Sequence, residues 1–438
     1  MRSASDNYWL DGPYEPGPAL WGEQEADVAI VGGGYTGLAA AYAIKRRFPA
    51  KRVLVLEAEY VGFGSSGRNS GGVTGMMGHN YTNLRKKYGS EKASHLQRLM
   101  SRAFALVEGL ILEHDIACDY QKTGRLLVAE TERQVRRLEE ERRACEDAGG
   151  KVEWLDCKDA GDRFGGAPVR VALRYPEEGI ADPVKFLRGM KRVVESLDVE
   201  IYEHTRCSHI EPGAKVSLYT PGGCIRAQDI VLATNAYPDP LRLFRHKVLP
   251  FYVYNIVTEP LSRSQMDALH LPGRENTFGA TNLYWAVRLT SDNRVVFTEC
   301  DALYFYDIEH DYSHQPGEYK SHYDLMVRKF PFLRGIRMTH GWGGRIGITL
   351  DFLPSVGCSG RHRNVYYSAG YNGSGLGVAQ LTGQMIAARM AGEKSDLTEN
   401  LLVDRRLLGV PSASLMYIGC QAYKGCFRLS DRLLNSGP

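Results

Sequence analysis

The sequence lacks the features that mark a membrane-spanning or disulfide-bonded secreted protein. No run approaches the roughly 18 apolar residues that cross a bilayer, and residues 1–25 are polar, with no apolar core of a secretory signal. We therefore expect a cytoplasmic protein without a membrane span. The nine cysteines stand at wide, irregular spacings without a C-x-x-C pair. This pattern predicts reduced thiols, and it predicts neither a disulfide frame nor a bound metal.

An excess of one charge is missing as well. Lys and Arg number 54 and Asp and Glu number 51, which leaves a net charge of +3 without a basic stripe. This balance argues against a nucleic-acid partner. What the chain has in excess is glycine, with 47 residues, where an average share of about 7% would give about 31. These glycines concentrate at residues 32–37, 62–78 and 341–383.

The first glycine cluster has the spacing of a dinucleotide-binding turn. Residues 27–31 form a short apolar run that predicts a buried strand, and residues 38–47 predict a helix. Between them stand Gly32, Gly34 and Gly37. In this G-x-G-x-x-G spacing the first glycine makes the tight turn, the second admits a pyrophosphate to the backbone, and the third lets the helix approach the strand. The helix N-terminus would then face the phosphates.

A second predicted strand, residues 52–57, ends in an acid that suits a ribose. Glu57 is placed to accept hydrogen bonds from the adenosine ribose hydroxyls, and its charge disfavours the 2′-phosphate of NADP. The glycine-rich stretch that follows, residues 61–72, favours FAD over NAD because a long loop can wrap the flavin part of a larger cofactor. The alternative is a mobile surface loop.

Several separated motifs together resemble a known family. The motifs that carry the resemblance are Asn7-Tyr8-Trp9, Val31 to Leu38, Gly62 to Asn69, Ala233 to Tyr237, Arg288 to Arg294, Gly341 to Arg345, Thr349 to Pro354 and Gly370 to Gly375. They occur in the order found in the FAD-dependent amine and amino-acid oxidases of the D-amino-acid oxidase superfamily, and the chain resembles the bacterial gamma-glutamylputrescine oxidase type in particular.

The resemblance implies an α/β fold of two domains. One would be a discontinuous, glutathione-reductase-like Rossmann domain that binds FAD, and the other an α+β substrate domain on a mainly antiparallel sheet. We expect the FAD-binding domain in residues 1–90, 165–240 and 340–395, the substrate domain in residues 91–164 and 241–339, and a C-terminal extension in residues 396–438.

The family pattern also implies which residues contact FAD. The motifs place these contacts at Gly32, Gly34, Tyr35, Thr36, Gly37, Glu57, Ala58, Gly64, Ser65, Ser66, Arg68, Asn69, Ser70, Gly71, Gly72, Thr234, Asn235, Gly344, Arg345, Gly373, Ser374, Gly375 and Leu376. Ser374 stands where many relatives carry His, so a His-based role is not transferred. The positions at which some relatives attach FAD through Cys or His carry neither here, which predicts non-covalent FAD. The turn before the predicted helix 376–390 would present free N–H groups to the flavin.

Hydrophobic periodicity and capping residues predict the remaining elements. Helices are expected at residues 90–114, 131–148 and 183–196, and strands at 199–202, 229–233, 251–257, 284–289 and 295–298. We expect residues 302–319, rich in tyrosine without clear periodicity, to form a loop or lid.

Aromatic residues of the substrate sheet are candidates for the wall that faces the flavin. Tyr252, Tyr284 and Trp285 could hold an ammonium group by cation–π attraction before it loses its proton. The alternative for each is core packing. His79 is a candidate proton acceptor, with an ordinary surface or core histidine as the alternative.

Three arginines are candidate anion partners. Amino-acid-oxidising relatives hold the substrate carboxylate with an arginine in the stretch that contains Arg345, although the matching register falls at Ile346. Because a shift of one residue on a strand reverses the face, Arg345 is either a carboxylate clamp or part of a structural ion pair. Arg288 is a second possible anion partner, and Arg68 either stabilises the reduced flavin or braces its loop.

The sequence therefore predicts an FAD-dependent enzyme that oxidises the C–N bond of an amine or amino acid to an imine by hydride transfer to flavin N5. Reoxidation by O2 to give H2O2 is the first expectation. Some oxidases carry a lysine that activates oxygen in the strand matching residues 294–298, and this chain has none there. An amine dehydrogenase with another electron acceptor is therefore one alternative, and a flavoprotein hydroxylase or oxidative-cyclisation enzyme is another.

Overall fold

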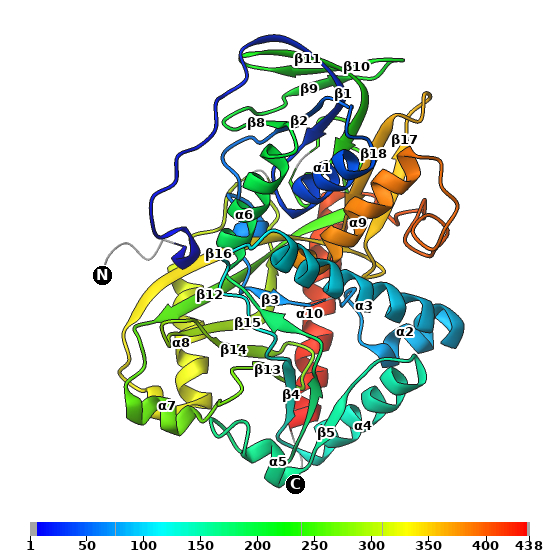
Figure 1. Cartoon of the computed structure of the whole chain (residues 1–438). Helices are drawn as coiled ribbons and strands as arrows, with labels where there is room; N and C mark the ends of the chain where they lie inside the picture. Colours follow the sequence, from blue (N-terminus) through cyan, green and yellow to red (C-terminus); the bar gives the residue numbers. More distant parts are fainter. Residues whose placement is uncertain (1–6, 75, 238, 309, 436–438) are drawn as a thin grey trace.

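Two large β-sheets organise the molecule. The computed structural model describes residues 7–74, 76–237, 239–308 and 310–435. One sheet lies in the upper half of Figure 1 and the other in the lower half, with helices packed around both. The chain crosses between the two sheets several times, so segments far apart in sequence meet where the sheets adjoin.

The first sheet is mainly parallel and holds the predicted dinucleotide-binding unit. Its strand order is β17-β18-β11-β1-β2-β8, and β9 and β10 extend β11. The strands are β1 (Gly22–Val31), β2 (Val53–Leu56), β8 (Val199–Tyr202), β9 (His209–Glu211), β10 (Val216–Thr220), β11 (Gly223–Leu232), β17 (Ser355–Ser359) and β18 (Val365–Ala369). All four residues of β2 are buried, as expected for a parallel strand covered on both faces.

The second sheet is mainly antiparallel. Its strand order is β16-β12-β15-β14-β13-β4-β6-β5, and among the described strands of this sheet β13 and β4 are the one parallel pair. The strands are β4 (Arg125–Ala129), β5 (Glu153–Leu155), β6 (Val171–Tyr175), β12 (Val248–Thr258), β13 (Asn276–Gly279), β14 (Trp285–Leu289), β15 (Val295–Tyr304) and β16 (Met338–Thr349). A small pair, β3 (Gly72–Val73) and β7 (Gly179–Ile180), lies apart from both sheets.

The helices enclose the sheets. They are α1 (Tyr35–Arg47), α2 (Tyr81–Tyr88), α3 (Ser90–Glu113), α4 (Glu132–Asp147), α5 (Cys157–Gly161), α6 (Pro183–Glu195), α7 (Arg263–Leu269), α8 (Pro316–Lys329), α9 (Gly375–Met390) and α10 (Ala413–Asn435), with short 3-10 turns at Tyr8–Leu10, Ser65–Gly67 and Pro331–Leu333. Small residues let α1 and α9 pack closely: a Cβ on Gly383 would lie 2.5 Å from the carbonyl carbon of Ala39.

Local sequence signals predicted several element boundaries correctly. The helix expected at residues 131–148 is α4, and its N-cap Thr131 accepts a hydrogen bond from the Gln134 N–H. The helix expected at 183–196 is α6, with Asp182 as N-cap and proline in its first turn. These signals held because caps and helical periodicity involve contacts within a few residues.

Long-range pairing overturned other predictions. The stretch 302–319 is not a continuous loop, because β15 runs to Tyr304 against β12 and α8 starts at Pro316. β6 and most of β16 fall within residues 165–240 and 340–395, which were expected in the FAD-binding domain, and both strands pair within the second sheet. In both cases hydrogen bonding to a strand distant in sequence determined the structure.

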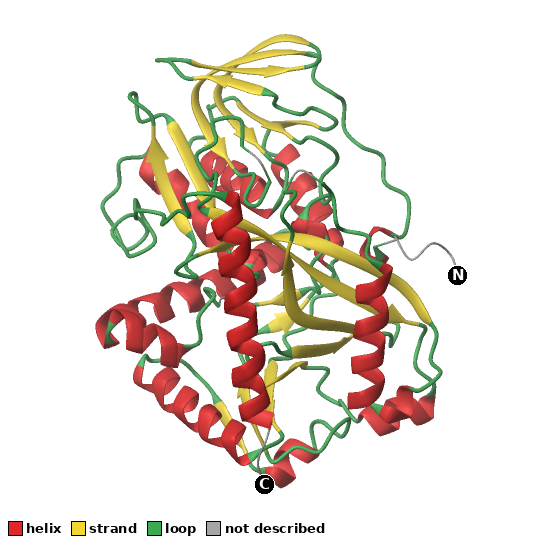
Figure 2. Ribbon diagram, turned by 180° about the vertical axis from the view of Figure 1, so that it is seen from behind, coloured by secondary structure: helices red, strands yellow, loops and turns green. Residues whose placement is uncertain are grey.

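The C-terminal helix α10 lies along one face of the second sheet (Figures 1 and 2). Asp431 holds its end by accepting hydrogen bonds from the backbone N–H groups of Asn282 and Leu283. Within the described ranges, no helix is both long and apolar enough to cross a bilayer.

Candidate active site

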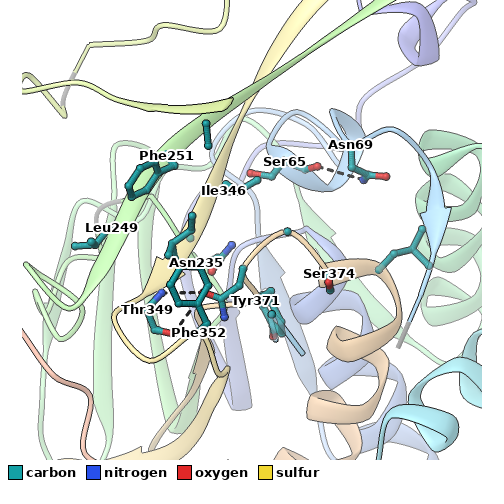
Figure 3. A pocket seen from close by; sticks show the side chains of 18 of the residues that line it. Ser65, Asn69, Asn235, Leu249, Phe251, Ile346, Thr349, Phe352, Tyr371 and Ser374 are labelled. Atoms are coloured by element: carbon teal, nitrogen blue, oxygen red, sulfur yellow. Dashed lines mark hydrogen bonds between the residues drawn. The ribbon is translucent and has the colours of Figure 1, made fainter. Parts of the chain in front are cut away.

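A large cavity runs between the two sheets. Its volume is about 1340 Å³, which exceeds the ~300–1,000 Å³ of most small-molecule sites. Its wall comes from the turn after β1, the loop after β2, the ends of β11 and β16, the start of α9, and one face of the second sheet. Figure 3 shows part of this wall: Asn235 follows β11, Ile346 lies on β16, and Tyr371 and Ser374 lie in the turn between β18 and α9.

The turn after β1 is a close-packed backbone cradle. Gly32 has φ +111°, and a Cβ there would lie 2.8 Å from the carbonyl oxygen of Ala233. A Cβ on Gly37 would collide with the Gly32 carbonyl oxygen. Glycine is therefore required at both positions, and α1 begins with its N–H groups at the cavity. Ser66 Oγ accepts a hydrogen bond of 3.1 Å from the first of these, the Tyr35 N–H.

Glu57 lies at the end of β2 on the cavity wall. Its carboxylate accepts hydrogen bonds from the Gly33 N–H at 2.7 Å and the Glu59 N–H at 3.0 Å. Burial raises the pKa of the Glu57 carboxyl, and these two bonds oppose the rise. The carboxylate has four lone-pair positions, so it can also accept bonds from a ligand hydroxyl.

The loop after β2 is held in place by its own polar groups. Asn69 Nδ2 donates to the Ser66 carbonyl at 2.7 Å and to the Tyr35 hydroxyl at 3.2 Å, while its Oδ1 accepts from the Gly71 N–H. Ser65 Oγ donates to the Arg345 carbonyl, which ties the loop to β16. The loop is therefore an ordered part of the cavity wall.

The start of α9 presents unused donors on the opposite side. Its N-cap Ser374 makes no side-chain capping bond, so among the described residues no cap competes with a ligand for the first N–H groups of α9. Asn235 Oδ1 accepts from the Gly370 N–H at 3.0 Å and fixes the turn that leads to α9. Beside it, the Thr234 hydroxyl is buried on the wall with no hydrogen-bond partner among the described residues.

Most of the predicted cofactor residues share this one wall. Those that line the cavity are Gly32, Gly34, Tyr35, Thr36, Glu57, Ala58, Gly64, Ser65, Ser66, Asn69, Ser70, Gly72, Thr234, Asn235, Gly373, Ser374, Gly375 and Leu376. Gly37, Arg68, Gly71, Gly344 and Arg345 are outside the described lining. Arg68 instead donates to the Phe63 carbonyl at 2.7 Å and to the Gly343 carbonyl at 3.3 Å, so it braces the loop.

The predicted substrate residues divide into one that lines the cavity and four that do not. Tyr284 lies on the wall. Trp285, the next residue, belongs to the core on the other face of the sheet. Tyr252 is 3% exposed and donates to the His310 carbonyl. Arg288 donates to the carbonyls of Ser70 and Ala181, which makes it a brace for the loop after β2.

Arg345 does not have the geometry of a carboxylate clamp. Its guanidinium donates to the Tyr252 hydroxyl at 2.8 and 3.0 Å and to the His310 carbonyl at 3.0 Å. The neighbouring residue of β16, Ile346, lines the cavity instead (Figure 3). The alternation of side chains along a strand places the two on opposite faces. Among the described residues Arg345 also forms no ion pair, which was the alternative role considered for it.

His79 does lie on the cavity wall. Its Nε2 lies 2.7 Å from the Asp351 carbonyl, so this nitrogen carries the proton. Burial lowers the pKa of His79, and the nearby Lys87 lowers it further. His79 is therefore neutral at pH 7 and has a free proton-accepting capacity on its other nitrogen.

Much of the rest of the wall was not predicted, including residues of α10 and α4. Tyr423 and Phe427 of α10 line the cavity, their rings 4.4 Å apart between centroids. Arg137 of α4 also lines it. The helical periodicity of residues 413–435 was available as a signal for α10, but nothing in the local sequence of α4 distinguishes Arg137 from its neighbours.

The chain matches proteins of known family over most of its length. The family model described as "DAO: FAD dependent oxidoreductase" matches residues 27–389. A gamma-glutamylputrescine oxidoreductase of Escherichia coli is 29% identical over 89% of this chain and 89% of its own, and a probable oxidoreductase OrdL of Haemophilus influenzae is 28% identical over 87% and 86%. The crystal structure of glycine oxidase from Geobacillus kaustophilus aligns with a TM-score of 0.72 and 21% identity, covering 88% of this chain and 100% of that one. This likeness confirms the predicted fold class.

Proposed function

Because the chain belongs to the DAO family of FAD-dependent oxidoreductases, we propose that it oxidises the C–N bond of an amine or amino acid to an imine. The turn after β1 (residues 32–37), the loop after β2 (residues 62–72) and the turn before α9 are here called the cofactor-type loops. The observation that carries the proposal is that one cavity is lined both by these loops and by an aromatic face of the second sheet. The names of two similar proteins, gamma-glutamylputrescine oxidoreductase and glycine oxidase, support an amine or amino acid as the substrate class.

The residues present fit an extended FAD molecule. The buried Thr234 hydroxyl without a partner and the glycine cradle at Gly32 are both explained if a polar ligand lies against the backbone there. We assign the pyrophosphate to the turn at residues 32–37, the ribose hydroxyls to Glu57, and the flavin end to the loop 62–72 and the start of α9. The cavity volume leaves space for a substrate beside the cofactor.

Bound FAD supplies a hydride acceptor for the carbon next to the amine nitrogen. The protein's own task is to hold the neutral amine there and to exclude water. The apolar side chains of Leu249, Phe251, Ile346 and Phe352 line the cavity and keep it dry. The substrate loses two electrons and two protons to become an imine, which water then hydrolyses to an aldehyde or a keto acid.

Two wall residues suit the handling of the amine. Tyr284 presents an aromatic ring that attracts an ammonium group. His79, neutral at pH 7 because burial lowers its pKa, can accept a proton from that ammonium group before the oxidation. We assign substrate holding to Tyr284 and proton acceptance to His79.

The electron acceptor is proposed to be O2, giving H2O2. A dehydrogenase that passes electrons to another acceptor is the second candidate, because the β15 strand carries no lysine at residues 295–298. Rapid reoxidation of the reduced enzyme in air supports the oxidase, and slow reoxidation that a quinone accelerates supports the dehydrogenase.

The experiment that tests the function is visible absorbance of the purified protein, recorded before and after anaerobic addition of polyamines, N-methyl amines and amino acids. We expect a flavin band that one of these compounds bleaches. Bleaching by NADPH without any amine would instead indicate a hydroxylase. A protein that holds no flavin after reconstitution with FAD contradicts the proposal.

A further inference from the structure

The cavity extends well beyond the cofactor-type loops. Its distal end is lined by Arg125, Arg137, Glu141, Asn276, Phe278 and Asn282. These residues come from α4, β4, β13 and the loop after β13, in the lower half of Figure 1, whereas the cofactor-type loops precede α1 and α9 in the upper half. The C-terminal end of α10 closes the distal end, since Asp431 binds Asn282. A ligand that fills this end reaches far from the glycine loops.

The other charged groups around the distal end are satisfied by protein partners. Arg125 forms a bidentate pair with Glu178 at 2.9 and 3.1 Å. Glu141 accepts from the N–H groups of Tyr81 and Thr82, from the Thr82 hydroxyl and from the Tyr175 hydroxyl. Lys424 pairs with Asp301 at 2.8 Å. None of these groups is left with its charge uncompensated.

Arg137 is the exception. Across the described residues it takes part in no hydrogen bond and no ion pair, although it is largely removed from solvent and lines the cavity. Asp431 and Glu141 attract it at longer range, but burial dominates and lowers the pKa of its guanidinium. Both of those carboxylates already accept several N–H or O–H bonds. An arginine in this position costs stability, so the fold itself does not explain it.

We propose that Arg137 binds a carboxylate at the end of the substrate remote from the reacting C–N bond. The inference rests on the proposed function and narrows it to amines that carry a carboxylate several bonds from the amine nitrogen. The planar guanidinium offers five N–H donors in a fork that matches a carboxylate with two parallel bonds. Leu127, Leu138 and Phe278 also line the cavity, and they provide apolar surface for the methylene chain between the two ends.

The test compares matched amines on matched variants. The probes are ω-amino acids from 4-aminobutanoate to 8-aminooctanoate and the alkylamines of the same chain length, each assayed by flavin bleaching and by steady-state kinetics. For Arg137→Gln we expect KM for the best ω-amino acid to rise about 10- to 100-fold, with kcat within about twofold of wild type. KM for the matching alkylamine should not change. Arg137→Lys should restore part of the lost affinity, since it keeps the charge and loses the fork.

The control variant is Arg136→Gln, which removes an exposed arginine from the preceding position of the same helix. It should behave as wild type with every probe. Flavin content and melting temperature provide a second readout. If Arg137 serves only to bind substrate, Arg137→Gln should melt at or above the wild-type temperature, because no protein contact is lost. If Arg137 has a structural role, the variant should melt at a lower temperature.

The outcomes separate the two proposals. If amines bleach the flavin but Arg137→Gln has the wild-type KM for both ω-amino acids and alkylamines, the proposed role of Arg137 is wrong and the proposed function stands. If alkylamines bleach the flavin of the wild-type protein as readily as ω-amino acids do, the proposal that the substrate carries a remote carboxylate is also wrong. If no amine of either series, nor any in the panel above, bleaches the flavin, the proposed function fails and the anchor fails with it.

Discussion

At the scale of single residues, Gly37 is the position where one added methyl group has the clearest consequence. Its Cβ would lie on the carbonyl oxygen of Gly32, a backbone atom that cannot rotate away. We predict that Gly37→Ala displaces the turn from the start of α1 and lowers the flavin retained after purification at least about tenfold, because the pyrophosphate site depends on that close approach. The measurement is flavin absorbance per mole of protein.

Gly109→Ala is the matched control. Gly109 lies in α3 with no other atom within 4 Å of the added Cβ, so alanine there should stabilise the protein by about 0.5–1 kcal/mol through a smaller entropy loss on folding. Normal flavin content in Gly37→Ala would contradict the assignment of this turn to the cofactor.

Glu203 carries a buried charge on which the N-terminal segment depends. It is 0% exposed and accepts from Lys191 Nζ at 2.7 Å, from the Tyr14 hydroxyl and from the N–H groups of Gly17 and Val61. Burial raises its pKa, but these bonds outweigh burial and leave the pKa below its ordinary value of 4.5. The carboxylate therefore stabilises the fold above about pH 4.5, and that stabilisation is lost as the pH falls through the folded-state pKa.

We predict that Glu203→Gln lowers the free energy of unfolding at pH 7 by about 3–5 kcal/mol, since it leaves the buried Lys191 with only the more distant Glu195 carboxylate, 3.9 Å away. The difference from wild type should shrink as the pH falls below about 4.5, because wild type then loses the same charge. Urea unfolding at pH 7 and pH 4 measures both. The control is Glu200→Gln on β8, the strand that ends just before Glu203. The half-exposed pair of Glu200 with Arg52 is worth about 0–1 kcal/mol, and an equal cost for both variants would contradict the argument.

At the scale of elements, α10 connects a segment outside the family match to the active-site cavity. The family model ends at residue 389, yet Tyr423 and Phe427 of α10 line the wall, and the Tyr423 ring lies 6.1 Å from that of Phe352 between centroids. The helix therefore forms part of the cavity wall although it lies outside the residues that the family model matches.

We predict that the double variant Tyr423→Ala with Phe427→Ala raises KM for the amine substrate about tenfold and leaves flavin content unchanged, because it removes apolar surface from the substrate side only. Steady-state kinetics and flavin absorbance measure the two effects. Leu429→Ala, at a 60% exposed position of the same helix, is the control. A loss of flavin with unchanged KM would place these rings at the cofactor instead.

The elements also show which structural features the local sequence could predict and which it could not. Thr131 and Asp182 cap their helices through bonds to residues two or three positions away, and both helices were predicted. The extension of β15 to Tyr304 and the pairing of β6 and β16 in the second sheet depend on strands far along the chain. No pattern inside residues 302–319 distinguishes an exposed loop from a strand edge.

At the scale of the whole molecule, one cavity couples cofactor binding to global stability. Both sheets and the starts of α1 and α9 contribute to its wall, so a ligand that binds only the folded state stabilises the whole chain. We predict that protein stripped of FAD melts several degrees lower, and that FAD at about 100 times its dissociation constant restores about 2.7 kcal/mol. Thermal melting followed by circular dichroism measures the shift.

NADP⁺ is the control for that measurement. Its 2′-phosphate would meet the Glu57 carboxylate, so it should not raise the melting temperature. A melting temperature that FAD leaves unchanged, or that NADP⁺ raises as much as FAD does, would contradict the assignment of Glu57 to the ribose.

The sequence by itself determined the cofactor turn, the acid after β2 and the family, because Gly32, Gly37 and Glu57 lie within one strand-helix-strand unit whose geometry follows from spacing. It did not determine which arginine faces the cavity. Arg345 and Ile346 differ by one step on β16, and the face that each takes depends on how β16 pairs with β12. Arg137 became a candidate only because folding brings α4 to the cavity, where its guanidinium has no hydrogen-bond or ion-pair partner among the described residues. Contacts within a short segment are encoded by spacing, whereas the pairing of a charge depends on every element packed around it.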